Sequence, residues 1–191
     1  MRSRTACDVL LDASVLCYFA EHGLLQYLRD YLGEHARITR EVERELLRLS
    51  TRPEFRQLHD YLATGGAVVR TVGKWPKTTK NLHDALKLEF DALHGLVRAI
   101  GEHERAHAGE IATVLMASHR RCDLVIIDDN WGSALARKKY RLEVMSTARL
   151  ALEMVTVGAL SEAEGFLVFD SASPEDVGRE RYEAGLRQLR S

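Results

Sequence analysis

Apolar residues occur in two patterns along this chain, as short continuous runs and as longer stretches with helical spacing. The short runs predict β-strands over residues 8–11, 36–39, 67–72, 124–127 and 142–145. Between them, apolar residues three or four positions apart predict amphipathic helices. Because strands alternate with helices, the pattern predicts an α/β fold with a central parallel sheet of about five strands.

The helical stretches have recognisable breaks. Gly23 divides the first stretch into two helices. Residues 81–118 are helical almost throughout, with a predicted break around Ala108-Gly109, and residues 174–190 form a charged terminal helix. The chain therefore contains more helix than an alternating strand–helix core requires, in the middle and at the C-terminal end.

Two of the predicted strands end in aspartate. Asp12 follows the run 9–11, and Asp128 and Asp129 follow the run 124–127. Ligands of parallel sheets collect beyond the carboxyl ends of the strands, so three carboxylates meet at one edge if these strands are neighbours. Alternatively, Asp12 and Asp128 cap the helices that follow them.

Composition and charge exclude several classes of protein. A length of 191 residues with 46% apolar residues fits one globular domain. The formal charge of -1 argues against a dedicated nucleic-acid coat protein, although it is compatible with a local basic patch. Cys7, Cys17 and Cys122 are odd in number and widely spaced, as expected of reduced core residues. No apolar stretch approaches the length of a membrane span, so we expect a cytoplasmic protein without membrane contact.

Two further acidic residues lie near the predicted core. The helix over 40–49 carries three glutamates, and at about 100° per residue Glu45 lies closer to its apolar stripe than Glu41 or Glu43. Glu110 occupies the first turn of a later helix, at the edge of that helix's stripe. The alternatives are structural, since a first-turn glutamate complements the helix dipole and Glu45 can pair with surface arginines.

Carboxylates gathered at strand ends and helix starts repel one another unless a divalent cation lies among them. Oxygen ligands that leave water positions open suit Mg²⁺ or Mn²⁺, and such sites usually serve phosphate chemistry. We therefore expect Mg²⁺ or Mn²⁺ as the cofactor.

Four segments contain these acids, in the order Leu10-Leu11-Asp12-Ala13-Ser14, Glu41-Val42-Glu43-Arg44-Glu45-Leu46, Gly109-Glu110-Ile111-Ala112 and Ile127-Asp128-Asp129-Asn130. Their order and setting resemble the PIN domain family of metal-dependent nucleases, over most of residues 7–145. The resemblance implies that the metal ligands and catalytic residues are Asp12, Glu45, Glu110, and one or both of Asp128 and Asp129. Some relatives carry another acid three residues before the third glutamate, where this chain has His107. The resemblance therefore does not decide whether the site holds one metal ion or two.

The resemblance also implies an architecture and partners. It implies a three-layer α/β/α domain over residues 1–191 with its core at about 7–145, a helical insertion at about 78–106 and a C-terminal helical extension at about 147–191. Many family members are ribonuclease toxins of bacterial toxin–antitoxin pairs, which implies an RNA substrate and an antitoxin partner. The added helices are candidates for a homodimer contact or for substrate selection.

The expected reaction is hydrolysis of an RNA phosphodiester by a metal-activated water. Ser14 is a candidate for orienting substrate, and a helix cap is its structural alternative. Basic residues that could follow the RNA backbone occur after the late aspartates and around Trp75. They are Arg137, Lys138, Lys139 and Arg141 in the first group, and Lys74, Lys77 and Lys80 in the second.

Two other functions compete with this one. The segment His103-Glu104-Arg105-Ala106-His107 matches the H-E-x-x-H pattern of zinc peptidases. A charged Arg105 is unusual in that pattern, however, and no third ligand is evident at a recognisable offset. The more serious alternative is a PIN-like module that binds nucleic acid or protein and retains its acids without turnover.

Overall fold

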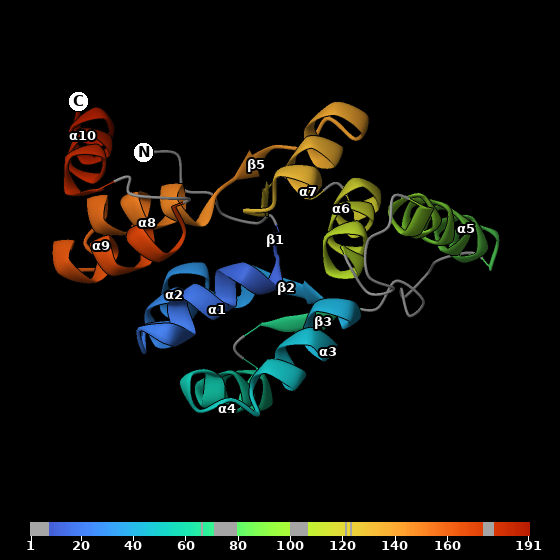
Figure 1. Ribbon diagram of the computed structural model, residues 1–191, viewed down its shortest axis with the longest axis horizontal. Coiled ribbons are helices and arrows are strands. Elements are labelled where there is room, and N and C mark those ends of the chain that lie inside the picture. Colours follow the sequence, from blue (N-terminus) through green and yellow to red (C-terminus); the bar gives the residue numbers. More distant parts are fainter. Residues whose placement is uncertain are drawn as a thin grey trace.

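The computed structural model describes residues 8–65, 67–70, 80–99, 107–120, 122, 124–173 and 178–191. Within these ranges the chain is an α/β protein with a parallel sheet, which confirms the predicted fold class (Figure 1). Cys7, Lys74, Lys77 and the segment 103–106 lie outside the described residues. The strands are β1 (Val9–Leu11), β2 (Ala36–Thr39), β3 (Val68–Arg70), β4 (Leu124–Ile126) and β5 (Val144–Met145).

Helices connect the strands and follow the last of them. Three short helical turns complete the connections, namely η1 (Gly33–His35), η2 (Pro53–Phe55) and the π-helical turn η3 (Leu135–Lys139). The longer helices are α1 (Ala13–Glu21), α2 (Leu25–Leu32), α3 (Arg40–Leu49), α4 (Arg56–Ala63), α5 (Lys80–Ala99), α6 (Ala108–Arg120), α7 (Asn130–Ala134), α8 (Thr147–Thr156), α9 (Glu162–Ser171) and α10 (Gly178–Arg190).

The strands pair in the order β3-β2-β1-β4-β5, and every pair is parallel. β1 and β4 are direct neighbours, with Leu10 opposite Val125 and Leu11 opposite Ile126. The amide of Asp12 continues this pairing by donating a hydrogen bond to Ile126 O at 3.0 Å. The two strands that end in aspartate therefore end side by side, which fulfils the condition under which their three carboxylates meet at one edge.

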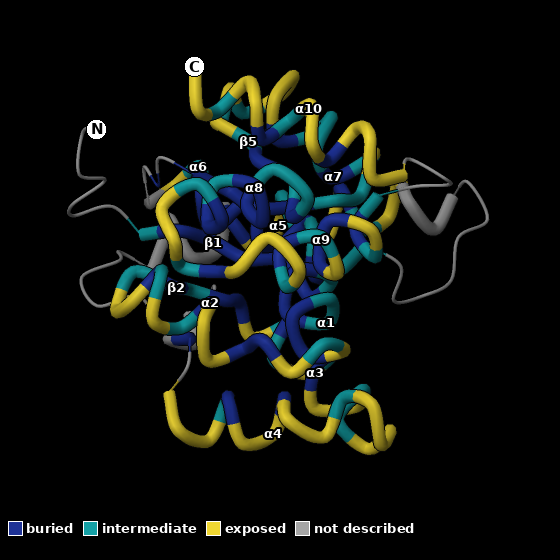
Figure 2. Tube along the Cα trace, turned by 90° about the vertical axis from the view of Figure 1, so that its left-hand side faces the viewer, coloured by how far each residue is buried: buried dark blue, intermediate teal, exposed yellow. Residues whose placement is uncertain are grey.

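Both faces of the sheet are buried against helices. In β1, Leu11 belongs to one hydrophobic cluster with residues of α1, α2, α8 and α9, whereas Leu10 belongs to a second cluster with residues of α6. Successive side chains of a strand point to opposite faces, so the continuous apolar run is the expected composition of a strand that is covered twice. Figure 2 shows buried residues along the centre of the molecule and exposed residues on α4 and α10.

The C-terminal helices pack on one another and share the hydrophobic core of the sheet. Met154 of α8, Val168 of α9 and Tyr182 of α10 belong to the same hydrophobic cluster as Leu11 of β1. Burial of side chains of this size contributes about 1.5–3 kcal/mol each. The segment 147–191 is therefore integrated with the core by its packing.

Some predicted boundaries differ from those in the structure. The predicted break around Ala108-Gly109 is confirmed one residue earlier, at His107, directly before α6 begins at Ala108. His107 has a φ of 58°, and this left-handed backbone conformation cannot belong to a right-handed helix. The last predicted strand, 142–145, is shorter and comprises only Val144 and Met145.

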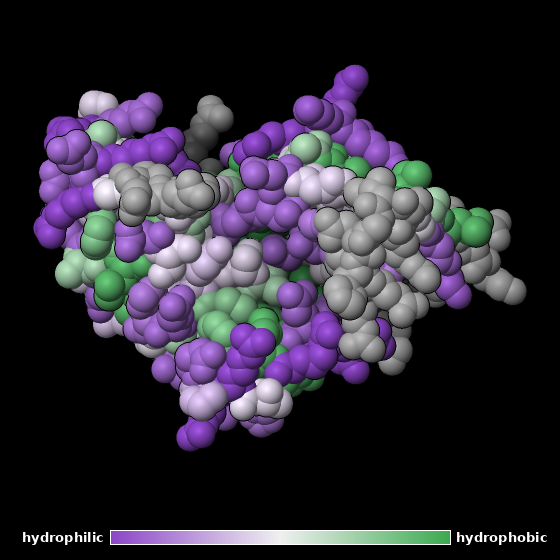
Figure 3. All heavy atoms as spheres, in the orientation of Figure 1, coloured by the Kyte–Doolittle hydropathy of each residue, from purple (hydrophilic) through white to green (hydrophobic). Residues whose placement is uncertain are grey.

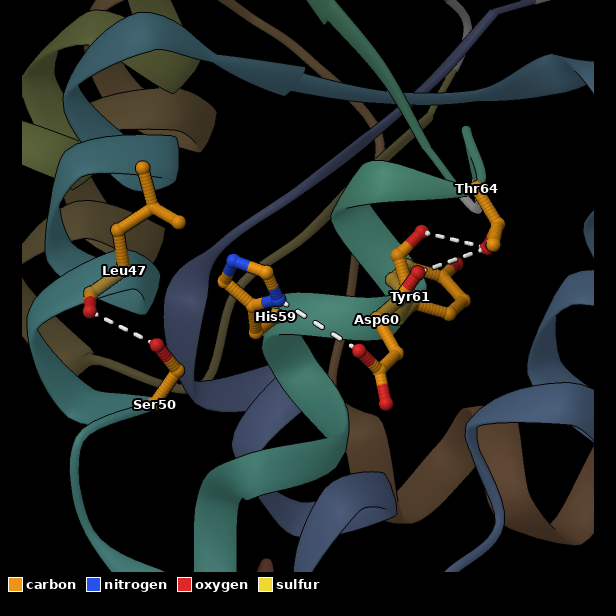
Figure 4. Close-up of polar contacts among 6 residues, drawn as sticks. All are labelled: Leu47, Ser50, His59, Asp60, Tyr61 and Thr64. Atoms are coloured by element: carbon orange, nitrogen blue, oxygen red, sulfur yellow. Dashed lines mark hydrogen bonds and ion pairs between the residues drawn. The ribbon is translucent and has the colours of Figure 1, made fainter.

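Hydroxyl groups accompany the ends of the two helices that follow β2 (Figure 4). Ser50 Oγ donates to Leu47 O at 2.8 Å after the last turn of α3. Thr64 Oγ1 donates to Asp60 O at 2.8 Å at the end of α4. Such bonds occupy carbonyl groups that a helix leaves unpaired at its C-terminus, and they help to fix the helix that bears Glu45.

The surface seen in Figure 3 is mostly hydrophilic, with apolar atoms in separate patches. Among the described helices, none is both long and apolar enough to cross a membrane.

Candidate metal centre

All five acidic residues predicted as ligands line one pocket of about 460 Å³ at the carboxyl edge of the sheet. They come from four parts of the chain that are far apart in sequence. Ser14 also lines the pocket, whereas Glu41 and Glu43 do not. The complete lining is Asp12, Ala13, Ser14, Cys17, Tyr18, Glu45, Glu110, Asp128, Asp129, Asn130, Ser171, Ala172 and Ser173.

Asp12 occupies the centre of the site, directly after β1. Its side chain is only 4% exposed, because the strand ends beneath α3 and α6. Ser14 Oγ donates to Asp12 Oδ2 at 2.9 Å and lies 3.5 Å from Asp128 Oδ2. The hydroxyl of Ser14 thus connects the carboxylates of two neighbouring strands, and its contact with substrate stays a prediction.

Glycine residues allow Glu45 and Glu110 to approach this centre. A Cβ atom on Gly109 would lie 3.3 Å from Glu45 Oε2 and 3.7 Å from Asp12 Oδ1, a spacing tighter than most side chains accept at the glutamate. A Cβ atom on Gly132 would lie 3.1 Å from the Cβ of Glu110. The start of α6 therefore fits against α3 and α7 because both glycines lack a side chain.

The Asp128-Asp129 doublet divides between two sides of the site. Thr147 binds Asp128 twice, with its amide donating to Oδ1 at 2.7 Å and its hydroxyl donating to Oδ2. Asp129 instead caps α7 by accepting a hydrogen bond from the amide of Gly132. Each carboxylate oxygen has two lone pairs, so both residues keep acceptor capacity for a cation.

Burial and mutual repulsion make the acids of this pocket hard to ionise. Burial, with a smaller contribution from the charge of Glu45, raises the pKa of Asp12 to about 6. Burial also raises the pKa of Glu110 to about 8, with a contribution from the charge of Asp12. The pKa values of Glu45 and Asp128 are likewise raised by burial, although Arg48 opposes the rise at Glu45 and Thr147 opposes it at Asp128. Bringing these groups together without a counterion costs free energy.

The donor set fits a divalent cation. The pocket offers carboxylate oxygens from opposite sides, and Gly109 leaves open the space that a Cβ would fill between Asp12 and Glu45. Hard oxygen donors with a solvent-accessible opening suit Mg²⁺ or Mn²⁺, which retain several bound waters. A cation held here would offset the repulsion that raises the pKa values of Asp12 and Glu110.

The basic residues predicted to contact RNA are not part of the pocket lining. Arg137 and Lys138 lie in the exposed turn η3, where Arg137 donates to Val144 O at 3.2 Å. Lys80 begins α5, and its side chain lies outside the described part of the chain. Their contact with substrate therefore remains a prediction.

A different group of cations approaches the pocket from α3. Exposed arginines recur every four residues from the start of α3 to the start of α4, and the charges of two of them act on residues of the pocket. Arg48 lowers the pKa of Glu45 against the effect of burial, and Arg52 does the same for Cys17. The members of this arginine row are Arg40, Arg44, Arg48, Arg52 and Arg56. Their four-residue spacing is visible in the sequence, but proximity to the pocket depends on how α3 packs.

Sequence patterns missed Thr147, which contacts the acids. Thr147 follows the last strand and is not marked by any sequence pattern, because its contact with Asp128 spans 19 residues. His107, which was singled out from the sequence, lies directly before α6 and three residues before Glu110. Its Nδ1 lies 3.5 Å from Glu110 Oε1, whereas the rest of the predicted zinc-peptidase motif lies outside the described residues.

The pocket therefore combines five acidic residues and one bridging hydroxyl, and the charges of Arg48 and Arg52 act on two of its lining residues. Such an arrangement can hold one or more divalent cations and admit an anionic chain. No protein-family model, curated protein or solved structure matches the chain.

Proposed function

We propose that the protein is a Mg²⁺- or Mn²⁺-dependent ribonuclease with a three-layer, PIN-like domain of about five strands. The observation that supports this function is the convergence of Asp12, Glu45, Glu110, Asp128 and Asp129 on one pocket. These acids are contributed by strand ends and helix starts that only the folded chain brings together. Structural roles alone do not require five acidic side chains at one place, since their repulsion costs free energy.

Four of the acids have a defined task in this proposal. Asp12 and Glu45 would hold the cation together with Glu110 at the start of α6. Thr147 and Ser14 orient the carboxylate of Asp128 toward the pocket. When bound, the cation supplies a water of lowered pKa and neutralises negative charge that develops on the phosphate. No side chain needs to act as a nucleophile.

The arginine row gives the RNA backbone a path to these acids. Arg48 and Arg52 lie near the pocket residues Glu45 and Cys17, and none of the ion pairs among the described residues engages them. Phosphate contacts position a nucleic acid without reading its sequence. Single-stranded RNA that follows this path would present successive phosphodiesters to the pocket.

Mutation of the row should weaken binding in a salt-dependent way. Replacing Arg48 and Arg52 by alanine is expected to flatten the slope of log affinity against log salt concentration by about 1.4, since each contact with a single strand contributes about 0.7. The affinity for single-stranded RNA is measured in fluorescence-anisotropy titrations at several salt concentrations. Arg181→Ala, an exposed change on α10, is the matched control. Equal slopes for all three proteins would exclude this path, and the same titration with Arg137→Ala and Lys138→Ala tests the turn η3.

The principal alternative is a binding module that retains the acids without turnover. Two observations favour it. Asp129 caps α7 and Asp128 is hydrogen-bonded by Thr147, so both residues have structural roles. Neither observation explains why Asp12, Glu45 and Glu110 share the same pocket.

A manganese titration distinguishes the two functions. A formed site should stabilise the folded protein by about 2.7 kcal/mol at a Mn²⁺ concentration 100 times the dissociation constant. Thermal unfolding measured with increasing Mn²⁺ detects this as a rising melting temperature, and the same samples are assayed for cleavage of single-stranded RNA. Stabilisation with cleavage supports the nuclease, whereas a constant melting temperature without cleavage supports the module.

Three further proposals depend on the nuclease function, namely a toxin role, an antitoxin partner and a homodimer. Growth arrest on expression, relieved by Asp12→Asn and by a co-expressed neighbouring gene, would support the toxin–antitoxin pair. Arrest that persists in the Asp12 variant would have another cause.

A further inference from the structure

The imidazole of His107 lies beside the acidic pocket with an unpartnered nitrogen. Its Nδ1 is 3.5 Å from Glu110 Oε1 and 3.9 Å from Asp129 Oδ2. This nitrogen is shielded from solvent and makes no hydrogen bond within the described part of the chain. A buried polar nitrogen without a partner costs about 1–3 kcal/mol. Its surroundings therefore suggest a ligand that the three side chains share.

The ring of His107 is held in place by its neighbours. It packs on Trp131 with ring centroids 5.0 Å apart, and its side chain is only 20% exposed. Asp129 is fixed in turn by its hydrogen bond to the amide of Gly132, one residue after Trp131. Two of the three side chains are thus oriented by the start of α7 before any ligand binds.

An ion pair between a protonated imidazole and the two acids describes this geometry less well. Both nitrogen–oxygen distances exceed those of ordinary hydrogen bonds, which are about 2.7–3.2 Å. One ligand atom from each of His107, Glu110 and Asp129 lies within 4.8 Å of the others, so the three surround a common point. Metal–ligand bonds are about 2.0–2.2 Å, so two ligand atoms of one ion lie at most about 4.4 Å apart, and the three side chains would move closer together on binding an ion.

We propose that His107, Glu110 and Asp129 form a second cation position, separate from the one that Asp12 and Glu45 hold on the other side of Glu110. The inference deepens the proposed metal-dependent function and rests on it for its biological use. It predicts a preference among metal ions that a site built of carboxylates alone would not have. Imidazole suits transition-metal ions such as Zn²⁺, whereas Mg²⁺ prefers oxygen ligands, so a nitrogen ligand at this position favours a transition-metal ion, Mn²⁺ included, over Mg²⁺.

Direct detection of the nitrogen ligand tests the proposal without any RNA. The probe is Mn²⁺ added to the purified full chain, observed by pulsed electron paramagnetic resonance, in which a coordinated imidazole gives a ¹⁴N modulation. The wild-type protein and the Asp12→Asn variant are expected to show this modulation, whereas His107→Gly should lose it. Glycine suits the positive φ at this position and supplies no ligand. His59→Ala, a change at an exposed histidine of α4, is the matched control and should keep the signal.

A second variant addresses metal preference. His107→Asp keeps a side chain that tolerates this backbone conformation and replaces nitrogen by oxygen. The ratio of Mn²⁺ to Mg²⁺ affinity, measured by calorimetry, is expected to fall about tenfold relative to wild type. An unchanged ratio in His107→Asp, or an unchanged ¹⁴N modulation in His107→Gly, would overturn the second position.

The outcomes separate this inference from the proposed nuclease function. A ¹⁴N modulation that depends on His107, in a protein that does not cleave RNA, would support the metal position and contradict the nuclease. Cleavage of RNA by a protein in which Mn²⁺ shows no ¹⁴N modulation would support the nuclease and contradict the second position.

Discussion

Replacing Asp12 by asparagine is expected to lower Mn²⁺-dependent cleavage of single-stranded RNA by more than about 100-fold. Asp12 lies at the centre of the pocket, and its Oδ2 shares the Ser14 hydroxyl with Asp128. Changes of residues that only orient metal ligands typically cost about 10–100-fold, so loss of a direct ligand should cost more. Rates of cleavage of a labelled RNA under single-turnover conditions measure the effect. The corresponding change at Asp128 should also abolish cleavage.

The same substitution should stabilise the metal-free protein. Burial raises the pKa of Asp12 from 3.8 to about 6, so its ionised form opposes folding at neutral pH. A neutral amide of similar shape removes this charge, and we expect an increase in unfolding free energy of about 1–2 kcal/mol, given about 1.4 kcal/mol per pKa unit. Urea unfolding in the presence of a chelator measures the change.

The combination of lost activity and gained stability is specific to a functional charge. Asp60→Asn, a change at an exposed aspartate of α4, is the matched control and should alter neither property. Undiminished cleavage by Asp12→Asn would contradict the proposed nuclease site. Lower stability of the metal-free variant would show that the carboxylate of Asp12 is needed for the fold itself.

The stability of the metal-free protein should fall as pH rises from about 5 to 9. The folded-state pKa values of Asp12 and Glu110 are raised from 3.8 to about 6 and from 4.5 to about 8. Groups with raised pKa values contribute stability that is complete below the unfolded-state pKa and is lost as pH rises through the folded-state pKa. We expect a loss on the order of 3 kcal/mol across this range. Chemical unfolding at a series of pH values, with a chelator present, measures it.

Manganese and a single substitution provide the controls for this pH profile. Cation binding requires ionised carboxylates, so saturating Mn²⁺ should remove most of the loss above pH 7. Glu110→Gln should flatten the part of the metal-free profile near pH 8, where Glu110 ionises. A metal-free profile that rises with pH over this range would contradict the raised pKa values and the repulsion on which the metal site is argued.

The elements near the site could largely be predicted because they follow from local patterns. Continuous apolar runs before Asp12 and Asp128 identified two strands, since only a sheet covered on both faces buries every side chain of a strand. The rotation of about 100° per helical residue also distinguished Glu45, which lines the pocket, from Glu41 and Glu43, which do not. The strand ends and the stripe of α3 are properties of short segments, and short segments are what a sequence pattern records.

Contacts that join distant segments could not be predicted in the same way. The hydrogen bond from Thr147 to Asp128 forms because the position of β5 in the sheet fixes where α8 begins. Residues 171–173 at the end of α9 line the pocket, although the sequence placed the core at about 7–145. Their positions follow from the packing of α9 against α8 and α1, and hydrophobic burial of this kind is non-directional and leaves no local spacing to recognise.

By itself, the sequence determined an α/β chain with a parallel sheet and with acids at the ends of two strands. Only the tertiary structure decided which acids meet. Parallel pairing of β1 with β4 joined Asp12 to the doublet, and the absence of side chains at Gly109 and Gly132 let α6 bring Glu110 beside them. It also gave the doublet two different environments, one at Thr147 and one at His107. The physical reason is that the chemistry of each carboxylate depends on burial, neighbouring charge and hydrogen bonds, and all three arise from packing between segments that are remote in sequence.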